Sequence, residues 1–278
     1  MNVAERQRPQ PGELYLDHVS HFVADLEAAA RVCQSLGLRV TATSVQQTPE
    51  GPVGAANRCL MLEAGYIELL APTHDTPAAN RMRALMRRYD GVHLVCFGTP
   101  EAESEHRRLS AHGYEPQPLV DLARAVDGGT ARFKVVRPAP EKMPEGRVQF
   151  VEQMTPEQLW READVNALEL AEVLVVAEEP VQAAARWARF AALLPRRERQ
   201  AVQLETKRGR ITIATREELV KLLGDAPAAP AIAGYAMRAR QPKELIARCK
   251  KAGLAVQRAG RRHAVRLPSA LGGVWLIG

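Results

Sequence analysis

The sequence predicts an α+β fold of four βαβββ units, paired into two domains with curved mixed sheets. Two observations carry this prediction. The order of one strand, one helix and three strands recurs along the 278 residues. Glycines that would end a helix, Gly37, Gly113 and Gly253, mark three of the four units. Such a unit leaves one face of its half-sheet open, so two units side by side form a cup and four units form two cups.

Each expected element has a local reason. Residues 14–23 alternate in polarity like a strand, and Asp25 is placed to cap a helix over 25–37. A hairpin over 57–72 turns around Glu63-Ala64-Gly65. The same order is expected again from 91–98 onward. The expected first strand and helix of units two, three and four are 91–98 and 101–113, 167–179 and 180–194, and 231–239 and 241–253.

The units divide the chain into a flexible tail over 1–13, one domain over 14–157 and a second, degenerate domain over 165–278. Hydrophobic residues make up 46% and charged residues 25%, as in ordinary globular proteins. The N-terminus has no apolar signal segment, and no apolar run is long enough to span a membrane. The four cysteines form no CxxC pair, which favours a reducing compartment. We therefore expect a cytoplasmic protein with no membrane partner.

The formal net charge of +6 allows two interpretations. A basic surface can bind nucleic acid or attract acidic small molecules. No helix-turn-helix, zinc-finger spacing or interleaved aromatic residues support nucleic acid. We expect mostly solvated arginines, a small-molecule substrate and no nucleic-acid partner, and the sequence leaves a homodimer open.

Four residues form a candidate metal site. His18 and His93 lie in the first strands of units one and two, and Glu68 and Glu152 lie in their last strands. Equivalent strands of paired units flank the same concave surface, so these four side chains are expected to converge. Two imidazoles and two carboxylates suit Zn²⁺, Ni²⁺, Co²⁺, Mn²⁺ or Fe²⁺. The alternative is that each is an ordinary strand residue, packed in the core or facing solvent.

Three further residues are candidates for substrate binding. Asn57 and Arg58 lie on a strand that could line the cup, where Arg could hold a carboxylate or phosphate. Tyr66 shares a strand face with Glu68. An edge-strand surface position is the alternative for Asn57 and Arg58.

The motifs LDHVSHFVADLEAA, YIELL and GVHLV, followed by TPEQLW and Asn166-Ala167, resemble the vicinal-oxygen-chelate superfamily of glyoxalase I and extradiol dioxygenases. The resemblance is closest to the glyoxalase-like branch and covers residues 14–180. The chain departs from relatives in having Gln153 where a His is common. In the second half, Glu172, Thr212 and Tyr235 occupy the slots of His18, Glu68 and His93, so that half is expected to be a structural or partner-binding copy.

The resemblance implies a divalent-metal-dependent lyase or isomerase of glyoxalase type, acting on a small molecule with vicinal oxygens. The metal would act as a Lewis acid, and Glu152 or Glu68 would move the proton as catalytic base. One alternative is an Fe²⁺ extradiol-type dioxygenase that uses His18, His93 and Glu152. Another is a non-enzymatic binding protein of the same fold.

Overall fold

The computed structural model describes residues 2–278, in which the order β, α, β, β, β occurs four times. Unit one consists of β1 (Tyr15–Phe22), α1 (Leu26–Ser35), β2 (Ser44–Thr48), β3 (Gly51–Ala64) and β4 (Tyr66–Pro72). Unit two consists of β5 (Gly91–Gly98), α3 (Ala102–Ala111), β6 (Val120–Val126), β7 (Gly129–Val136) and β8 (Arg147–Gln153). Between them lies α2 (Pro77–Met86), which Thr76 caps by accepting a hydrogen bond from the amide of Ala79.

The strands of units one and two close into a ring, which we call the barrel (β1–β8). The first and last strands of each unit pair in parallel, β1 with β4 and β5 with β8. The antiparallel pair β1–β5 joins the units on one side. On the other side the ring continues from β4 through β3, β2, β6 and β7 to β8. A closed ring has no free edge, and alternate side chains of each strand point into it.

Units three and four form an open sheet. Unit three consists of β9 (Asn166–Val176), α4 (Pro180–Ala191), β10 (Pro195–Glu198), β11 (Ala201–Glu205) and β12 (Arg210–Ala214). Unit four consists of β13 (Ala231–Ala239), α6 (Pro242–Lys251), β14 (Val256–Ala259), β15 (Arg262–Arg266) and β16 (Val274–Ile277), and α5 (Arg216–Leu223) precedes it. The strand order is β10-β11-β12-β9-β13-β16-β15-β14. A short parallel pairing of β3 with β9 joins this sheet to the barrel.

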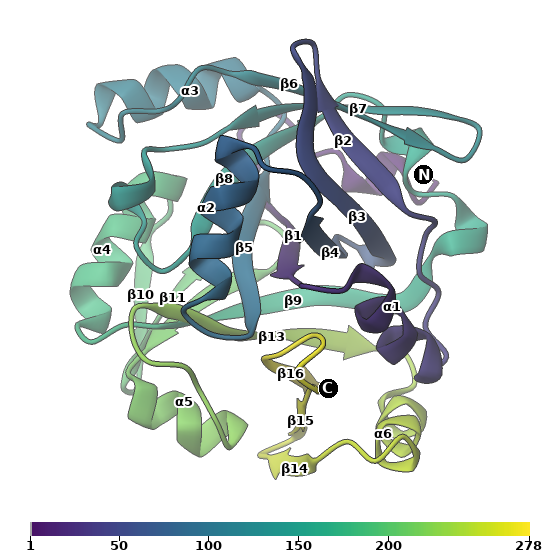
Figure 1. The fold of residues 1–278 in the computed structure, drawn as a ribbon. Coiled ribbons are helices and arrows are strands. Elements are labelled where there is room, and N and C mark those ends of the chain that lie inside the picture. The colour runs from purple at the N-terminus through teal and green to yellow at the C-terminus, as the bar shows by residue number, and fades with distance from the viewer. Residues whose placement is uncertain (1) are drawn as a thin grey trace.

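The two halves share the largest apolar core. In Figure 1 the strands β9 and β13 cross the molecule beside the barrel, with α5 and α6 on their far side. The outward residues of β1 and β5, such as Val19 and Val95, pack in one cluster with Val173 and Trp275 of the second half. The barrel therefore depends on the second sheet to cover the outer faces of β1 and β5.

The N-terminal segment differs from the expected flexible tail over 1–13. Residues Glu5–Gln7 form a 3₁₀ turn, and Val3, Ala4 and Gln7 are buried. The Gln7 amide nitrogen donates to the carbonyl of Glu63, and its oxygen accepts from the amide of Gly65. The turn that joins β3 and β4 thus has its backbone groups satisfied by this segment, which composition alone could not reveal.

In the described residues, no helix combines the length and the apolarity that a membrane span requires.

A buried histidine connects the two halves. The His21 ring contacts the Leu271 carbonyl through Nδ1 and the Tyr235 hydroxyl through Nε2, each at 3.0 Å. Trp275 donates to the same hydroxyl. Burial lowers the pKa of His21 from 6.5 to about 4. The imidazole is therefore neutral in the folded protein at pH 7.

This burial predicts a pH-dependent stability. The unfolded chain protonates His21 below pH 6.5, whereas the folded chain does so only near pH 4, so stability falls as the pH falls through this window. The loss from this residue is at most about 3 kcal/mol. In the variant His21→Gln, the unfolding free energy measured in urea at pH 7 and pH 4.5 should therefore differ less than in the wild type. Equal differences in both proteins would contradict this assignment.

Candidate functional site

Polar side chains fill much of the barrel interior, where a small apolar core would be the simpler solution. Strand alternation points most of them inward, from six strands. They are Asp17, His18, Ser20, Gln46, Asn57, Glu68, Arg124, Gln149 and Gln153, together with Tyr66, Arg137 and Arg147 near them. Burying so many polar groups costs free energy unless each finds a partner, so the partners define the site.

Glu68 is held by three neutral donors. Its carboxylate accepts from the Ser20 hydroxyl at 2.5 Å, the Gln46 amide at 3.0 Å and the Asn57 amide at 2.5 Å. The Arg124 guanidinium donates to the Asn57 oxygen at 2.8 Å. Asn57 therefore links the buried guanidinium of Arg124 to the buried carboxylate of Glu68 through two hydrogen bonds. The carboxylate is already well satisfied by side chains of this chain.

His18 has a different set of neighbours. Its Nδ1 lies 2.6 Å from the Asp17 carboxylate, and its ring stacks on Tyr66 with centroids 4.2 Å apart. When Nδ1 donates to Asp17, Nε2 is free to accept, and the Tyr66 hydroxyl lies 3.5 Å from it. Donor atoms of Asp17, His18 and Cys96 lie within 4.8 Å of one another. The register of β1 against β5 shifts between Leu16 and His18, and we attribute the inward position of Asp17 to this irregularity.

His93 does not join His18 and Glu68. Its Nε2 donates to the Tyr89 carbonyl at 2.9 Å, and its ring packs against Tyr89 and Phe22. Its Nδ1 is buried without a partner. Burial lowers the pKa of His93 to about 4, so the ring is neutral at pH 7.

Glu152 also lies apart from the other predicted ligands. It pairs with Lys134 across β7 and β8 and accepts a hydrogen bond from the Ala102 amide at 2.9 Å. That amide belongs to the first turn of α3, where a carboxylate satisfies an unpaired donor and the helix dipole. The predicted convergence of His18, Glu68, His93 and Glu152 is therefore wrong.

The predicted roles of His93 and Glu152 assume a wrong register of unit two against unit one. The distance from His18 to Gly37 is 37 − 18 = 19 residues, and counting 19 back from Gly113 gives Leu94, not His93. Ser20 pairs with Glu68, and the matching pair in unit two is Cys96 with Gln149. The equivalents of His18 and Glu68 are thus Leu94 and Gln149. A slip of an odd number of residues moves a strand side chain to the opposite face.

The alternation of side chains along each strand also separates the three substrate-binding candidates into inward-facing and outward-facing residues. Asn57 and Tyr66 face the interior. Arg58 points outward, where it donates to the Thr41 carbonyl at 2.8 Å and pairs with Glu27 at 2.6 Å. Arg58 therefore does not line the cup. The arginines that do enter the interior are Arg124, Arg137 and Arg147, which the sequence analysis did not single out.

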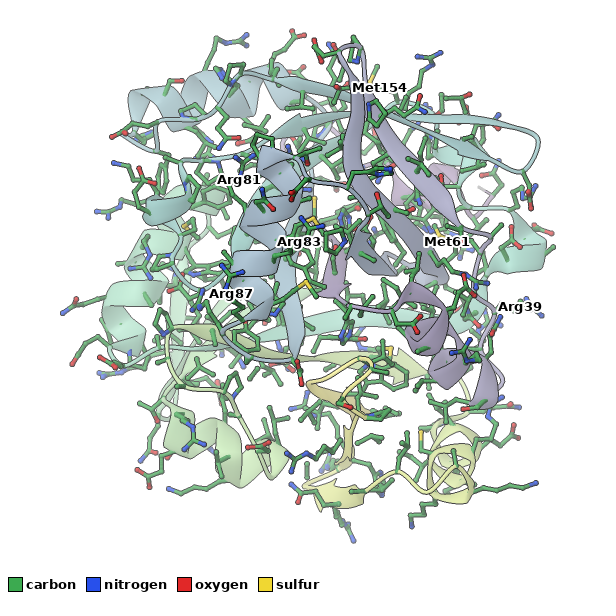
Figure 2. All side chains as sticks on the ribbon, viewed as in Figure 1. Arg39, Met61, Arg81, Arg83, Arg87 and Met154 are labelled. Atoms are coloured by element: carbon green, nitrogen blue, oxygen red, sulfur yellow. The ribbon has the colours of Figure 1, made fainter. Side chains whose placement is uncertain are left out.

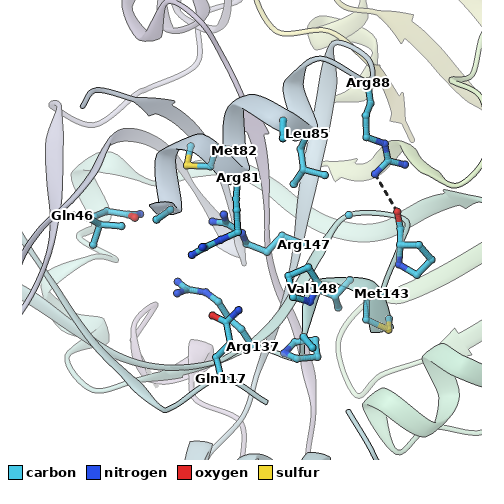
Figure 3. Close-up of a pocket in the computed structure, with 18 residues that line it drawn as sticks. Gln46, Arg81, Met82, Leu85, Arg88, Gln117, Arg137, Met143, Arg147 and Val148 are labelled. Carbon is cyan, nitrogen blue, oxygen red and sulfur yellow. Dashed lines mark hydrogen bonds between the residues drawn. The ribbon is translucent and has the colours of Figure 1, made fainter. Parts of the chain in front are cut away.

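These arginines lead to a cavity of about 290 Å³ at the end of the barrel. The helix α2 forms one wall; it carries Arg81 and Arg83, and Arg87 follows its last residue (Figure 2). Figure 3 shows the side chains of Arg81, Arg137 and Arg147 meeting at the centre of this cavity. Gln46, Arg137 and Arg147 also border the barrel interior, so the cavity leads to the polar cluster. Burial, Arg137 and Arg81 lower the pKa of Arg147 below its usual value.

The matching positions of the second half hold no comparable cluster. Glu172 accepts hydrogen bonds from Thr212, Arg210 and Arg262. Burial opposes its charge, but these donors outweigh it and keep the pKa of Glu172 below its usual value. Tyr235 is used in the contact with His21. Glu172, Thr212 and Tyr235 thus already form hydrogen bonds with other side chains of this protein.

The two predicted carboxylate ligands should differ in their effect on stability. Glu68→Gln places an amide donor among three donors, and we expect it to lower the unfolding free energy by about 2–4 kcal/mol. Glu152→Gln removes one partly exposed contact to a helix end and should cost less than about 1 kcal/mol. Urea denaturation at pH 7 measures both. Equal losses would show that the two acids share one environment.

Comparison with solved structures shows the fold in other proteins. A hypothetical protein from Staphylococcus aureus has a TM-score of 0.67 at 13% identity, over 95% of this chain and 98% of its own. Catechol 2,3-dioxygenase has a TM-score of 0.59 at 13% identity, over 95% of this chain and 87% of its own. A mutant of 4-hydroxymandelate synthase from Streptomyces coelicolor has a TM-score of 0.58 at 14% identity, over 95% and 92%. At these identities the likeness concerns the fold alone.

No curated protein matches the sequence. The family model described as "Glyoxalase-like domain" matches residues 16–191, which include the barrel and the first strand and helix of unit three. The chain therefore belongs to the glyoxalase-like domain family.

Proposed function

We propose that the barrel binds a small organic molecule in the cavity between α2 and the ends of β7 and β8, without a four-ligand metal centre. The observation that carries this proposal is the cavity of about 290 Å³, whose apolar walls end at convergent polar groups that lead into the barrel. Pockets that bind small molecules have this combination of an apolar lining and a few placed polar groups. The proposal corresponds to the binding-protein alternative for this fold.

The residues present do not fit the metal site that the fold family implies. Leu94 and Gln149 stand at the positions equivalent to His18 and Glu68, and neither a leucine nor a neutral amide replaces an imidazole or carboxylate well. Glu68 itself is satisfied by Ser20, Gln46 and Asn57. We therefore assign no step of a lyase, isomerase or dioxygenase reaction to this set.

A metal-dependent enzyme is the second candidate, and one observation favours it. Asp17, His18 and Cys96 are buried and offer three donor atoms within 4.8 Å of one another. A carboxylate, an imidazole and a thiolate suit Zn²⁺, which would supply Lewis-acid activation of a substrate oxygen. To hold the ion, the Asp17–His18 hydrogen bond would have to open and Cys96 would have to lose its proton.

Elemental analysis of the purified protein separates these candidates. We expect far less than one divalent ion per chain, both in the wild type and in Cys96→Ser. A stoichiometric ion that Cys96→Ser loses and Glu152→Gln keeps would establish the second candidate. An ion that Glu68→Gln and His93→Gln both lose would contradict the assignment of the barrel interior given above.

Binding in the cavity is tested with two fluorescent probes that share one aromatic skeleton, neutral N-phenyl-1-naphthylamine and the anionic 1-anilinonaphthalene-8-sulfonate. We expect saturable 1:1 binding of at least one probe to the folded protein. Ala78 lines the cavity from α2, so Ala78→Trp should fill it and abolish that signal while thermal unfolding stays cooperative. If neither probe binds, or if Ala78→Trp leaves binding unchanged, the proposed function is wrong.

A further inference from the structure

We propose that the ligand of this cavity is an amphipathic anion, whose charged head lies between Arg81, Arg137 and Arg147 and whose apolar body lies against α2. This inference rests on the proposed function and names the chemistry of its ligand. It follows from the charge of the lining, from the partners of each arginine and from the apolar surface beside them.

The lining carries positive charge only. Among the residues that border the cavity, four are arginines and none is acidic: Arg81, Arg88, Arg137 and Arg147. Arg88 is engaged at the rim, where it donates to the carbonyls of Pro144 and Pro230. The other three come from separate elements, α2, the residue after β7 and the start of β8. Their charges are brought together by the fold and not by one run of basic sequence.

These three arginines have no carboxylate partner within the described residues 2–278. Arg137 donates to the neutral Gln149 oxygen at 2.9 Å, and Arg147 lies over the Phe22 ring at 5.3 Å. No side chain in that part of the protein accepts a hydrogen bond from Arg81. By contrast, Arg83 on the same helix pairs with Asp75 at 3.2 Å. Arg83, which does not line the cavity, thus has a carboxylate partner, whereas Arg81, Arg137 and Arg147, which line it, have none.

Glu68, the acid that borders the barrel interior together with Arg137 and Arg147, does not fill that role. Its two oxygens already accept three hydrogen bonds, and one of the donors, Asn57, in turn accepts a hydrogen bond from Arg124. Like charges gathered in a partly buried space repel one another, because the local dielectric is lower than that of water. An anion between them would remove this repulsion and would take several charge-assisted hydrogen bonds from the guanidinium groups.

The rest of the lining identifies the other end of the ligand. The side chains of Met82, Leu85, Met143 and Val148 face the cavity, and three prolines border it. Methionines adapt to ligands of irregular shape, and Gln46 and Gln117 are the uncharged polar side chains among the lining residues. Carboxylate, sulfonate and phosphate heads share the required chemistry, and the cavity wall favours an aliphatic or aromatic body.

The experiment compares the two fluorescent probes, which differ by one sulfonate. We expect 1-anilinonaphthalene-8-sulfonate to bind at least about tenfold more tightly than N-phenyl-1-naphthylamine. Arg147→Gln and Arg81→Gln should each remove most of this preference and leave the affinity for the neutral probe nearly unchanged. Arg87→Gln is the matched control, because it removes the same charge from an exposed position at the end of α2. Its affinities should equal those of the wild type.

Competitors then identify the head group. Octanoate and octyl phosphate should displace the anionic probe, whereas 1-octanol should not, and the ratio of the two displacement constants shows which anion is preferred. If both probes bind equally tightly, or if Arg87→Gln weakens the anionic probe as much as Arg147→Gln does, the inference is overturned while small-molecule binding stands. If neither probe binds, the proposed function fails with it.

Discussion

The closure of eight strands into a ring is the constraint on which the site depends. In a closed ring, each strand has one face toward the interior and one face away from it, and a residue cannot change faces without a bulge. The pairs β1–β4 and β5–β8 fix the register, so Glu68 and Gln149 enter while Arg58 and Glu152 do not. Which side chains can act inside the barrel therefore depends on the strand face they occupy, more than on which residue types occur nearby in the sequence.

The second half has a structural role that follows from the same ring. Most of the outward residues of β1 and β5 are apolar and need cover, which β9 and β13 provide. His21 shows how close this contact is, since both of its ring nitrogens have partners on the second half. Polar residues of the second half also form hydrogen bonds within that half. Glu172, for example, accepts hydrogen bonds from two arginines and a threonine. The degenerate copy thus supports the barrel instead of repeating its site.

Much of the fold could be predicted from the sequence, and the site only in part. Strand alternation and helix-ending glycines predicted the α+β class and the recurring elements, and the motifs around His18 and Glu68 predicted the family. A His-for-His match between the first strands of units one and two indicates His93, whereas the helix end at Gly113 indicates Leu94. The arginine group was missed because Arg81, Arg137 and Arg147 are far apart in the chain and belong to no motif. Only the pairing of β7 with β8 and the position of α2 bring them together.

The central claim is that His18 and Glu68 lie inside the barrel while His93 and Glu152 lie outside it. The most direct measurement is an anomalous difference map from crystals of this protein soaked in Mn²⁺ or Zn²⁺. We predict no anomalous peak bonded to His93 or Glu152, and electron density for Leu94 and Gln149 on the interior face. One peak within about 2.0–2.3 Å of His18, Glu68, His93 and Glu152 together would contradict the register and the account built on it.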